Sequence, residues 1–226
     1  MPSSQLVFDV SHALSVSVLL LSFALIYQRR LLAVFNAFAV QAMLVAAAAA
    51  WQAFTQAAPH FYVTALIALV FKGVVIPMSL RAIVRRLGIH GTIETVLGVN
   101  LALLAGVGLV ALSILLVFPV VSTPTGMTRE NLAIALSIVL IGLLMMITRR
   151  NAVTQVVGFM SMENGLVLAA VGVQDMPLVV EISVAFAVLI AFIVFGMFFF
   201  RIRERFDSLD LQYLESFRGD RAGGGP

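Results

Sequence analysis

Apolar residues dominate the chain in seven long runs, each broken by only a few polar positions. The runs cover Val10–Tyr27, Leu31–Gln56, His60–Ser79, Ile93–Val121, Leu132–Ile147, Ala152–Val173 and Pro177–Phe200. As helices, most are long enough to cross the ~30 Å hydrocarbon core of a bilayer. The Leu132–Ile147 run is short, and we expect it to extend into Arg129–Asn131. The pattern predicts an all-α, polytopic membrane protein with seven transmembrane helices.

The composition agrees with lipid as the main solvent. Of the 226 residues, 62% are hydrophobic and 11% are charged, and the mean hydropathy is +1.09. A soluble domain is about half apolar and about a quarter charged. The net charge of +3 does not indicate a nucleic-acid partner, since the arginines lie in short loops. Residues 1–5 lack the basic region of a signal peptide, so we expect the first span to be retained.

The basic residues predict the orientation. Gln28-Arg29-Arg30 and Thr148-Arg149-Arg150 are the only breaks between their flanking runs, which predicts two tight turns between antiparallel helices. If the first turn is cytoplasmic, every Lys and Arg except Arg129 and Lys72 is either cytoplasmic or in the C-terminal tail on that side. The positive-inside rule then places the N-terminus outside and the C-terminus inside.

The order of spans and arginines also suggests an internal repeat. A shift of 120 residues superimposes the two double-arginine turns, and Ser17 and Leu20 then align with Ser137 and Leu140. We expect a parallel three-helix repeat, although chance likeness of two hydrophobic triplets is the alternative. The predicted units are 1–91 (first repeat), 92–128 (connector helix and outer loop), 129–200 (second repeat) and 201–226 (cytoplasmic amphipathic tail). A frayed, solvated tail is the alternative for the last unit.

Three ionisable residues lie inside the predicted spans: Lys72, Glu163 and Glu181. Lys72 and Glu163 are each about twelve residues into their runs, near the membrane midplane at helical rise. A charge there costs ~2.5–3.5 kcal/mol, so such residues are functional candidates. A static Lys72–Glu163 ion pair is the alternative. Glu181 is close enough to the end of its run to reach the interface.

Other span residues could support a hydrated path. Asn164, Gln41 and Asn100 are polar, and bonding between helices is the plainer explanation for each. Pro77 cannot donate a hydrogen bond to the carbonyl of Gly73, so we expect a kink beside Lys72.

Resident cofactors are not expected. The chain has no cysteine, which excludes disulfides and thiolate-held clusters. His12, His60 and His90 are far apart, so no metal site and no catalytic centre is predicted.

Several motifs resemble known membrane subunits. Thr148-Arg149-Arg150-Asn151 and the stretch Val157–Gly165 resemble the small K subunit of bacterial complex I. Met162-Glu163-Asn164-Gly165, Leu178–Ile182, and Phe71-Lys72 with Val75-Ile76-Pro77 resemble component E of hydrogenase-4. The chain departs from the K subunit at Met160, where that subunit would have Glu, and near 187–189, where it has no later membrane Glu.

The resemblance implies a non-catalytic subunit of a complex I-like redox complex in the bacterial inner membrane. Its partners would be antiporter-like subunits and the membrane anchor of a hydrogenase or related module. Glu163, Lys72 and Glu181 would belong to a proton-translocation path, and redox cofactors would lie on the partners. The alternatives are an autonomous small ion or solute transporter and a non-conducting structural subunit.

Overall fold

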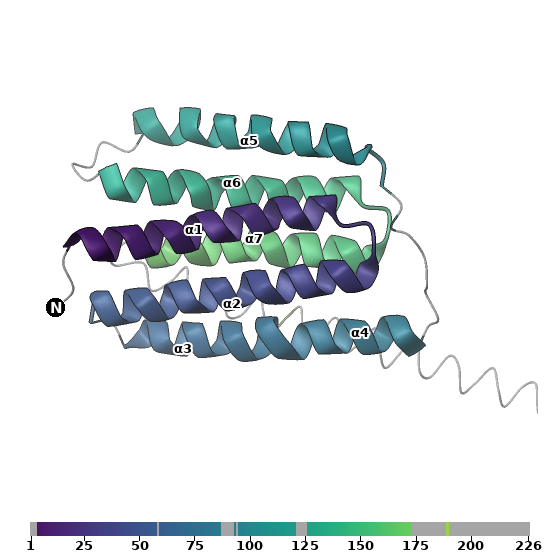
Figure 1. Ribbon diagram of the computed structural model, residues 1–226, viewed down its shortest axis with the longest axis horizontal. Helices are drawn as coiled ribbons and strands as arrows, with labels where there is room; N and C mark the ends of the chain where they lie inside the picture. Colours follow the sequence, from purple (N-terminus) through teal and green to yellow (C-terminus); the bar gives the residue numbers. More distant parts are fainter. Residues whose placement is uncertain are drawn as a thin grey trace, which may run out of the picture.

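Long helices lie side by side in a single bundle (Figure 1). The computed structural model describes residues 4–57, 59–86, 93, 95–120, 126–172 and 189. The elements are α1 (Ser4–Tyr27), α2 (Leu31–Thr55), α3 (His60–Ile67), the π-helical segment η1 (Ala68–Val75), α4 (Ile76–Arg86), α5 (Val99–Val120), α6 (Gly126–Thr148) and α7 (Ala152–Gly172). Because α3, η1 and α4 follow one another without a break, they form one continuous rod.

Within these ranges, six helices are long and apolar enough to cross a membrane. Their apolar stretches are Gln5–Tyr27, Leu31–Thr55, His60–Ala82, Val99–Pro119, Arg129–Thr148 and Val153–Val171. The described part of the chain is therefore all-helical and compatible with a multi-pass membrane protein. The predicted seventh span, apart from Leu189, and the tail 201–226 lie outside the described residues.

One predicted boundary is wrong. The fourth run was expected to become helical at Ile93, but α5 begins at Val99. The backbone N–H of Ile93 instead donates to the carbonyl of Arg29 at 2.9 Å, and that of Val96 donates to the carbonyl of Thr148 at 2.8 Å. These bonds attach the non-helical segment before α5 to both double-arginine turns. The short fifth run does extend toward its N-terminus, as expected, since α6 begins at Gly126.

Two helical hairpins form the centre of the bundle. α1 and α2 make one, α6 and α7 make the other, and each helix of one hairpin packs on a helix of the other, α1 on α6 and α2 on α7. The rod α3–η1–α4 lies against α2, and α5 lies against α6 at the opposite edge (Figure 1). The turns between α1 and α2 and between α6 and α7 are at the same end as the C-terminus of α4.

Glycines allow α6 and α7 to approach closely. A Cβ atom on Gly142 would lie 2.5 Å from the backbone nitrogen of Met162, and one on Gly165 would lie 2.9 Å from the carbonyl oxygen of Ala135. Side chains there would collide with backbone rather than with a flexible neighbour. Small residues at such contacts are typical of helix pairs in membranes, where van der Waals packing replaces the hydrophobic effect.

Serine hydroxyls inside the helices donate hydrogen bonds to backbone carbonyls of the same helix. Ser11, Ser15 and Ser22 of α1 and Ser137 of α6 each donate to the carbonyl four residues earlier, at 2.7–3.1 Å. This local bond lets a polar residue occupy an apolar bundle without a second partner. Large apolar side chains on the outer faces are exposed, such as Leu104 and Leu115 on α5, as expected for surfaces that contact lipid.

Candidate functional site

Lys72 lies where the third rod departs from α-helical geometry. It is in η1, the π-helical segment Ala68–Val75, and the N–H of Ile76 that closes this segment bonds to the carbonyl of Phe71, five residues back. Pro77 follows immediately and has no N–H to offer Gly73. Short π-helical segments are frequent at functional sites because they redirect side chains. Here the Lys72 side chain is directed into the bundle and is 2% exposed, while its neighbours Phe71 and Val74 face outward.

Glu163 of α7 meets Lys72 inside the bundle. Lys72 Nζ is 3.0 Å from Glu163 Oε1, and the two side chains are 3% and 2% exposed. This is the distance of an ion pair. Glu163 Oε2 is also buried and has no hydrogen-bond partner among the described residues. The pair is therefore closely matched in position, yet the carboxylate has unused acceptor capacity.

A chain of amides continues from this pair across the bundle. Lys72 Nζ also donates to Asn164 Oδ1 at 3.3 Å, and Asn164 Nδ2 donates to Gln41 Oε1 at 3.3 Å. Gln41 Nε2 donates to Ser22 Oγ at 2.8 Å and to Ser161 Oγ at 3.0 Å. We call these five residues, together with Glu163, the polar network: Ser22, Gln41, Lys72, Ser161, Glu163 and Asn164. Every member is buried, and together they connect η1, α7, α2 and α1.

The structure brings four of the sequence candidates together: Lys72, Glu163, Asn164 and Gln41. Asn100 is not among them, because it is exposed in the first turn of α5, a helix that packs on α6 and α1. Glu181 lies outside the described residues.

Sequence reasoning missed Ser22 and Ser161 as members of the network. A signal for Ser22 was available, since Ser11, Ser15 and Ser22 are spaced by four and seven residues. That spacing puts them on one face of a helix. No comparable pattern singled out Ser161.

Arg149 joins the two hairpins at the end that carries their turns. Its Nη2 atom donates to the carbonyls of Leu25, Ile26 and Gln28 at 3.0, 2.8 and 3.0 Å. These carbonyls are at the C-terminus of α1, where a helix has acceptors without intrahelical donors and a partial negative charge. Arg149 is 2% exposed, and burial lowers the pKa of its guanidinium from the ordinary value. An arginine keeps its charge under such conditions, so Arg149 acts as a charged cap on α1.

Among the described residues, no group of three His, Cys, Asp or Glu side chains is placed to hold a metal ion. His12 Nδ1 and Glu130 Oε2 approach to 3.7 Å near the opposite end of the bundle, with both side chains partly exposed. In the polar network, Lys72 and Glu163 are the two members whose side chains can gain or lose a proton near neutral pH.

Comparison with known proteins adds one relative. The chain is 37% identical over 120 residues to an uncharacterized protein from Mycobacterium tuberculosis, a match that covers 53% of this chain and 54% of the relative. The chain thus matches about half the length of that curated protein. No family model and no solved structure matches the chain.

Proposed function

We propose that this protein is a non-catalytic membrane subunit that contributes a proton-exchanging site to a complex I-like, energy-converting redox complex. The observation that carries the proposal is the buried contact of 3.0 Å between Lys72 Nζ and Glu163 Oε1. Burying two charges is costly even when they are paired, and an apolar pair of similar size would often be at least as stable. A purely structural role therefore gives little reason to keep this pair.

The chemistry of the pair suits proton exchange. Moving one proton from the ammonium to the carboxylate converts an ion pair into a neutral pair with little movement of heavy atoms. Burial disfavours the ion pair, whereas the attraction between the two charges favours it. Because the two effects oppose each other, the ion pair and the neutral pair are both accessible. Glu163 Oε2, which lacks a partner among the described residues, is an atom where a proton from water can bind. The Asn164 amide, which accepts from Lys72, holds the ammonium in place.

The type of complex is inferred from sequence likeness. The stretches that resemble hydrogenase-4 component E, residues 71–77 and 162–165, are the ones that supply Lys72, Glu163 and Asn164. On this proposal the chain spans the inner membrane seven times, its tail is cytoplasmic, and antiporter-like subunits lie beside it. The clustering of both double-arginine turns and the C-terminus of α4 at one end (Figure 1) supports a cytoplasmic location for that end.

Glu163→Gln is the sharpest test, because it keeps the shape and removes the titratable oxygen. In native membranes carrying the assembled complex, we expect proton translocation per turnover to fall at least tenfold while the complex still assembles. Glu130→Gln is the matched control, since Glu130 is about half exposed; it should leave translocation unchanged. Normal assembly with undiminished translocation in Glu163→Gln would remove this residue from the mechanism.

One contact favours the second candidate, an autonomous ion or solute transporter. Gln41 and Ser161 are 120 residues apart and hydrogen-bonded to each other, and 120 residues is the shift that aligns the proposed repeats. Equivalent positions meet in this way near a two-fold axis, an arrangement that supports a parallel transporter repeat. The purified chain alone in liposomes separates the two: flux by the lone protein would favour the transporter. Flux only with co-purified subunits favours the redox complex.

A further inference from the structure

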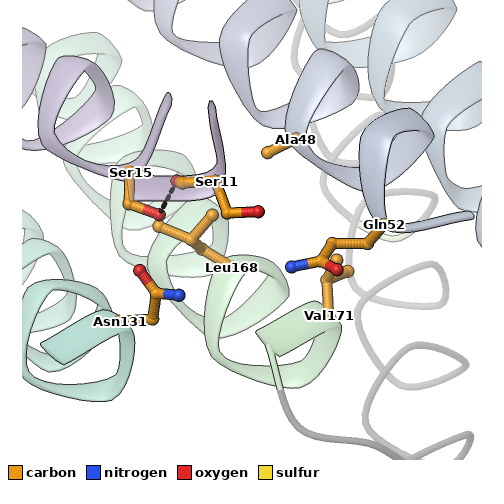
Figure 2. Close-up of a pocket in the computed structure, with 7 residues that line it drawn as sticks. All are labelled: Ser11, Ser15, Ala48, Gln52, Asn131, Leu168 and Val171. Carbon is orange, nitrogen blue, oxygen red and sulfur yellow. Dashed lines mark hydrogen bonds between the residues drawn. The ribbon is translucent and has the colours of Figure 1, made fainter. Parts of the chain in front are cut away.

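A small recess lined by both polar and apolar residues lies between the two hairpins, away from the polar network. It is lined by Ser11 and Ser15 of α1, Ala48 and Gln52 of α2, Asn131 of α6, and Leu168 and Val171 of α7 (Figure 2). Its empty volume is about 270 Å³ including its open side, and its enclosed part has room for about one water molecule. Its α1 residues, Ser11 and Ser15, are in the N-terminal half of α1 (Ser4–Tyr27), whereas the first arginine turn follows the C-terminus of that helix.

The lining is suited to water. Asn131 Oδ1 is buried without a hydrogen-bond partner among the described residues, and Figure 2 shows its amide turned toward the recess. The hydroxyls of Ser11 and Ser15 donate hydrogen bonds to backbone carbonyls, so their oxygens can still accept hydrogen bonds from water. Gln52 directs its amide nitrogen toward the recess (Figure 2). A buried water needs two to four such partners.

The recess and the polar network share the same helix faces. On three helices a recess residue and a network residue are seven positions apart: Ser15 and Ser22 on α1, Ala48 and Gln41 on α2, and Leu168 and Ser161 on α7. Seven residues are two turns, so each pair shares a face and is separated by roughly 10 Å along the axis.

An apolar layer lies between them. Val18 of α1 and Val45 of α2 occupy the intervening turns, and Ala135 of α6 lies one turn beyond the recess residue Asn131. All three are at most 1% exposed and belong to one packed cluster. The recess is partly open without any change to this packing, whereas a water path from it to the polar network would require the layer to loosen. Along the bundle, the order is the recess, an apolar layer and the buried Lys72–Glu163 pair.

We propose that the recess is the water-filled entrance by which protons reach the Lys72–Glu163 pair from the side opposite the arginine turns. The inference rests on the proposed function for its final step, delivery of a proton to Glu163. The entrance itself rests on the recess and its unpartnered amide oxygen. Val18, Val45 and Ala135 form the barrier that keeps this entrance closed at rest.

The absence of cysteine from the chain allows a direct test by single cysteines in the full complex. Ag⁺, which is small and reacts with thiols in contact with water, is added to one side of sealed vesicles. Thiols that remain are then labelled after denaturation. Ser15→Cys is the recess variant. Leu20→Cys is the matched control on the same helix, because Leu20 is 64% exposed on the outer face, where lipid is the neighbour.

We expect Ser15→Cys to react at least tenfold faster than Leu20→Cys, and only from the side opposite the arginine turns. Ag⁺ bound at Ser15→Cys should also reduce proton translocation at least fivefold. Equal reactivity of the two thiols, faster reaction from the arginine side, or full translocation with Ag⁺ bound would each overturn the entrance. If Ser15→Cys does not react with Ag⁺ but Glu163→Gln abolishes proton translocation, the proposed function holds and this entrance is wrong. If Ser15→Cys reacts with Ag⁺ but Glu163→Gln translocates protons normally, the recess contains water and the proposed function is wrong.

Discussion

The close contact of α6 and α7 makes a quantitative prediction for Gly142→Ala. The new Cβ would be 2.5 Å from the backbone nitrogen and 2.7 Å from the Cα of Met162. Ordinary contacts of a Cβ atom lie at 3.4–4 Å, so the helices must separate by roughly 1 Å. Neither contacting atom can move by rotating a side chain. The separation must therefore be taken up by the two backbones.

The expected cost is at the upper end of the range for overpacking, about 3 kcal/mol. Separation by 0.5–1 Å already forfeits about a quarter to a half of each dispersion contact, and this seam extends along α6 and α7 to Gly165. Alanine favours the helix over glycine by up to about 1 kcal/mol, which offsets part of the loss. We expect a net loss of about 2 kcal/mol in the free energy of unfolding.

Gly108→Ala on α5 is the matched control. A Cβ at Gly108 would meet nothing within 4 Å, so only the gain in helix propensity applies there. Both variants are purified in mild detergent and unfolded with SDS, with helicity followed by circular dichroism. Gly142→Ala should unfold at lower SDS than the parent protein, and Gly108→Ala at equal or higher SDS. If the two variants are equally stable, the close backbone approach described for α6 and α7 is incorrect.

The other predictions use the same SDS titration. Lys72→Met alone leaves the Glu163 carboxyl buried without its partner and should cost about 3–5 kcal/mol, whereas Lys72→Met with Glu163→Gln should recover most of that loss; additive losses would contradict the pairing. Arg149→Gln removes the cap on α1 and should cost about 1.5–3 kcal/mol, while Arg29→Gln, at an exposed position, should change stability by less than about 0.5 kcal/mol. Gln41→Leu leaves its amide and hydroxyl partners without their hydrogen bonds to this side chain and should lower the free energy of unfolding by about 1–3 kcal/mol. Unchanged stability would argue against a connected network.

The helices of the described region could be predicted from sequence because the bilayer imposes a simple rule on length and polarity. Long apolar runs must form helices whose backbone groups bond internally, and the two arginine pairs mark the turns between adjacent runs. The start of the fourth helix could not be found this way. Ile93 and Val96 are apolar and β-branched, so nothing local distinguishes a helical start from backbone bonds to distant turns.

The centre of the polar network was also predictable, but its extent was not. Lys72 and Glu163 stand out because charges inside apolar runs are rare, and their similar depth suggested a meeting. That Asn164 and Gln41 would connect the pair to Ser22 depends on how the helices are rotated about their axes. Rotation follows from packing, such as the glycine contacts of α6 and α7 and the π-helical segment around Lys72. None of these can be read from hydropathy.

The bonds at the arginine end also determine how the two hairpins can move relative to each other. Arg149 holds the end of α1 through three carbonyls, and the segment around Ile93 and Val96 is hydrogen-bonded to both turns. Sliding or separation at this end would break several of these bonds at once. Toward the other end, the recess lies between the same hairpins. We therefore expect any relative motion of the two hairpins to be smallest at the arginine end and largest at the end that has the recess.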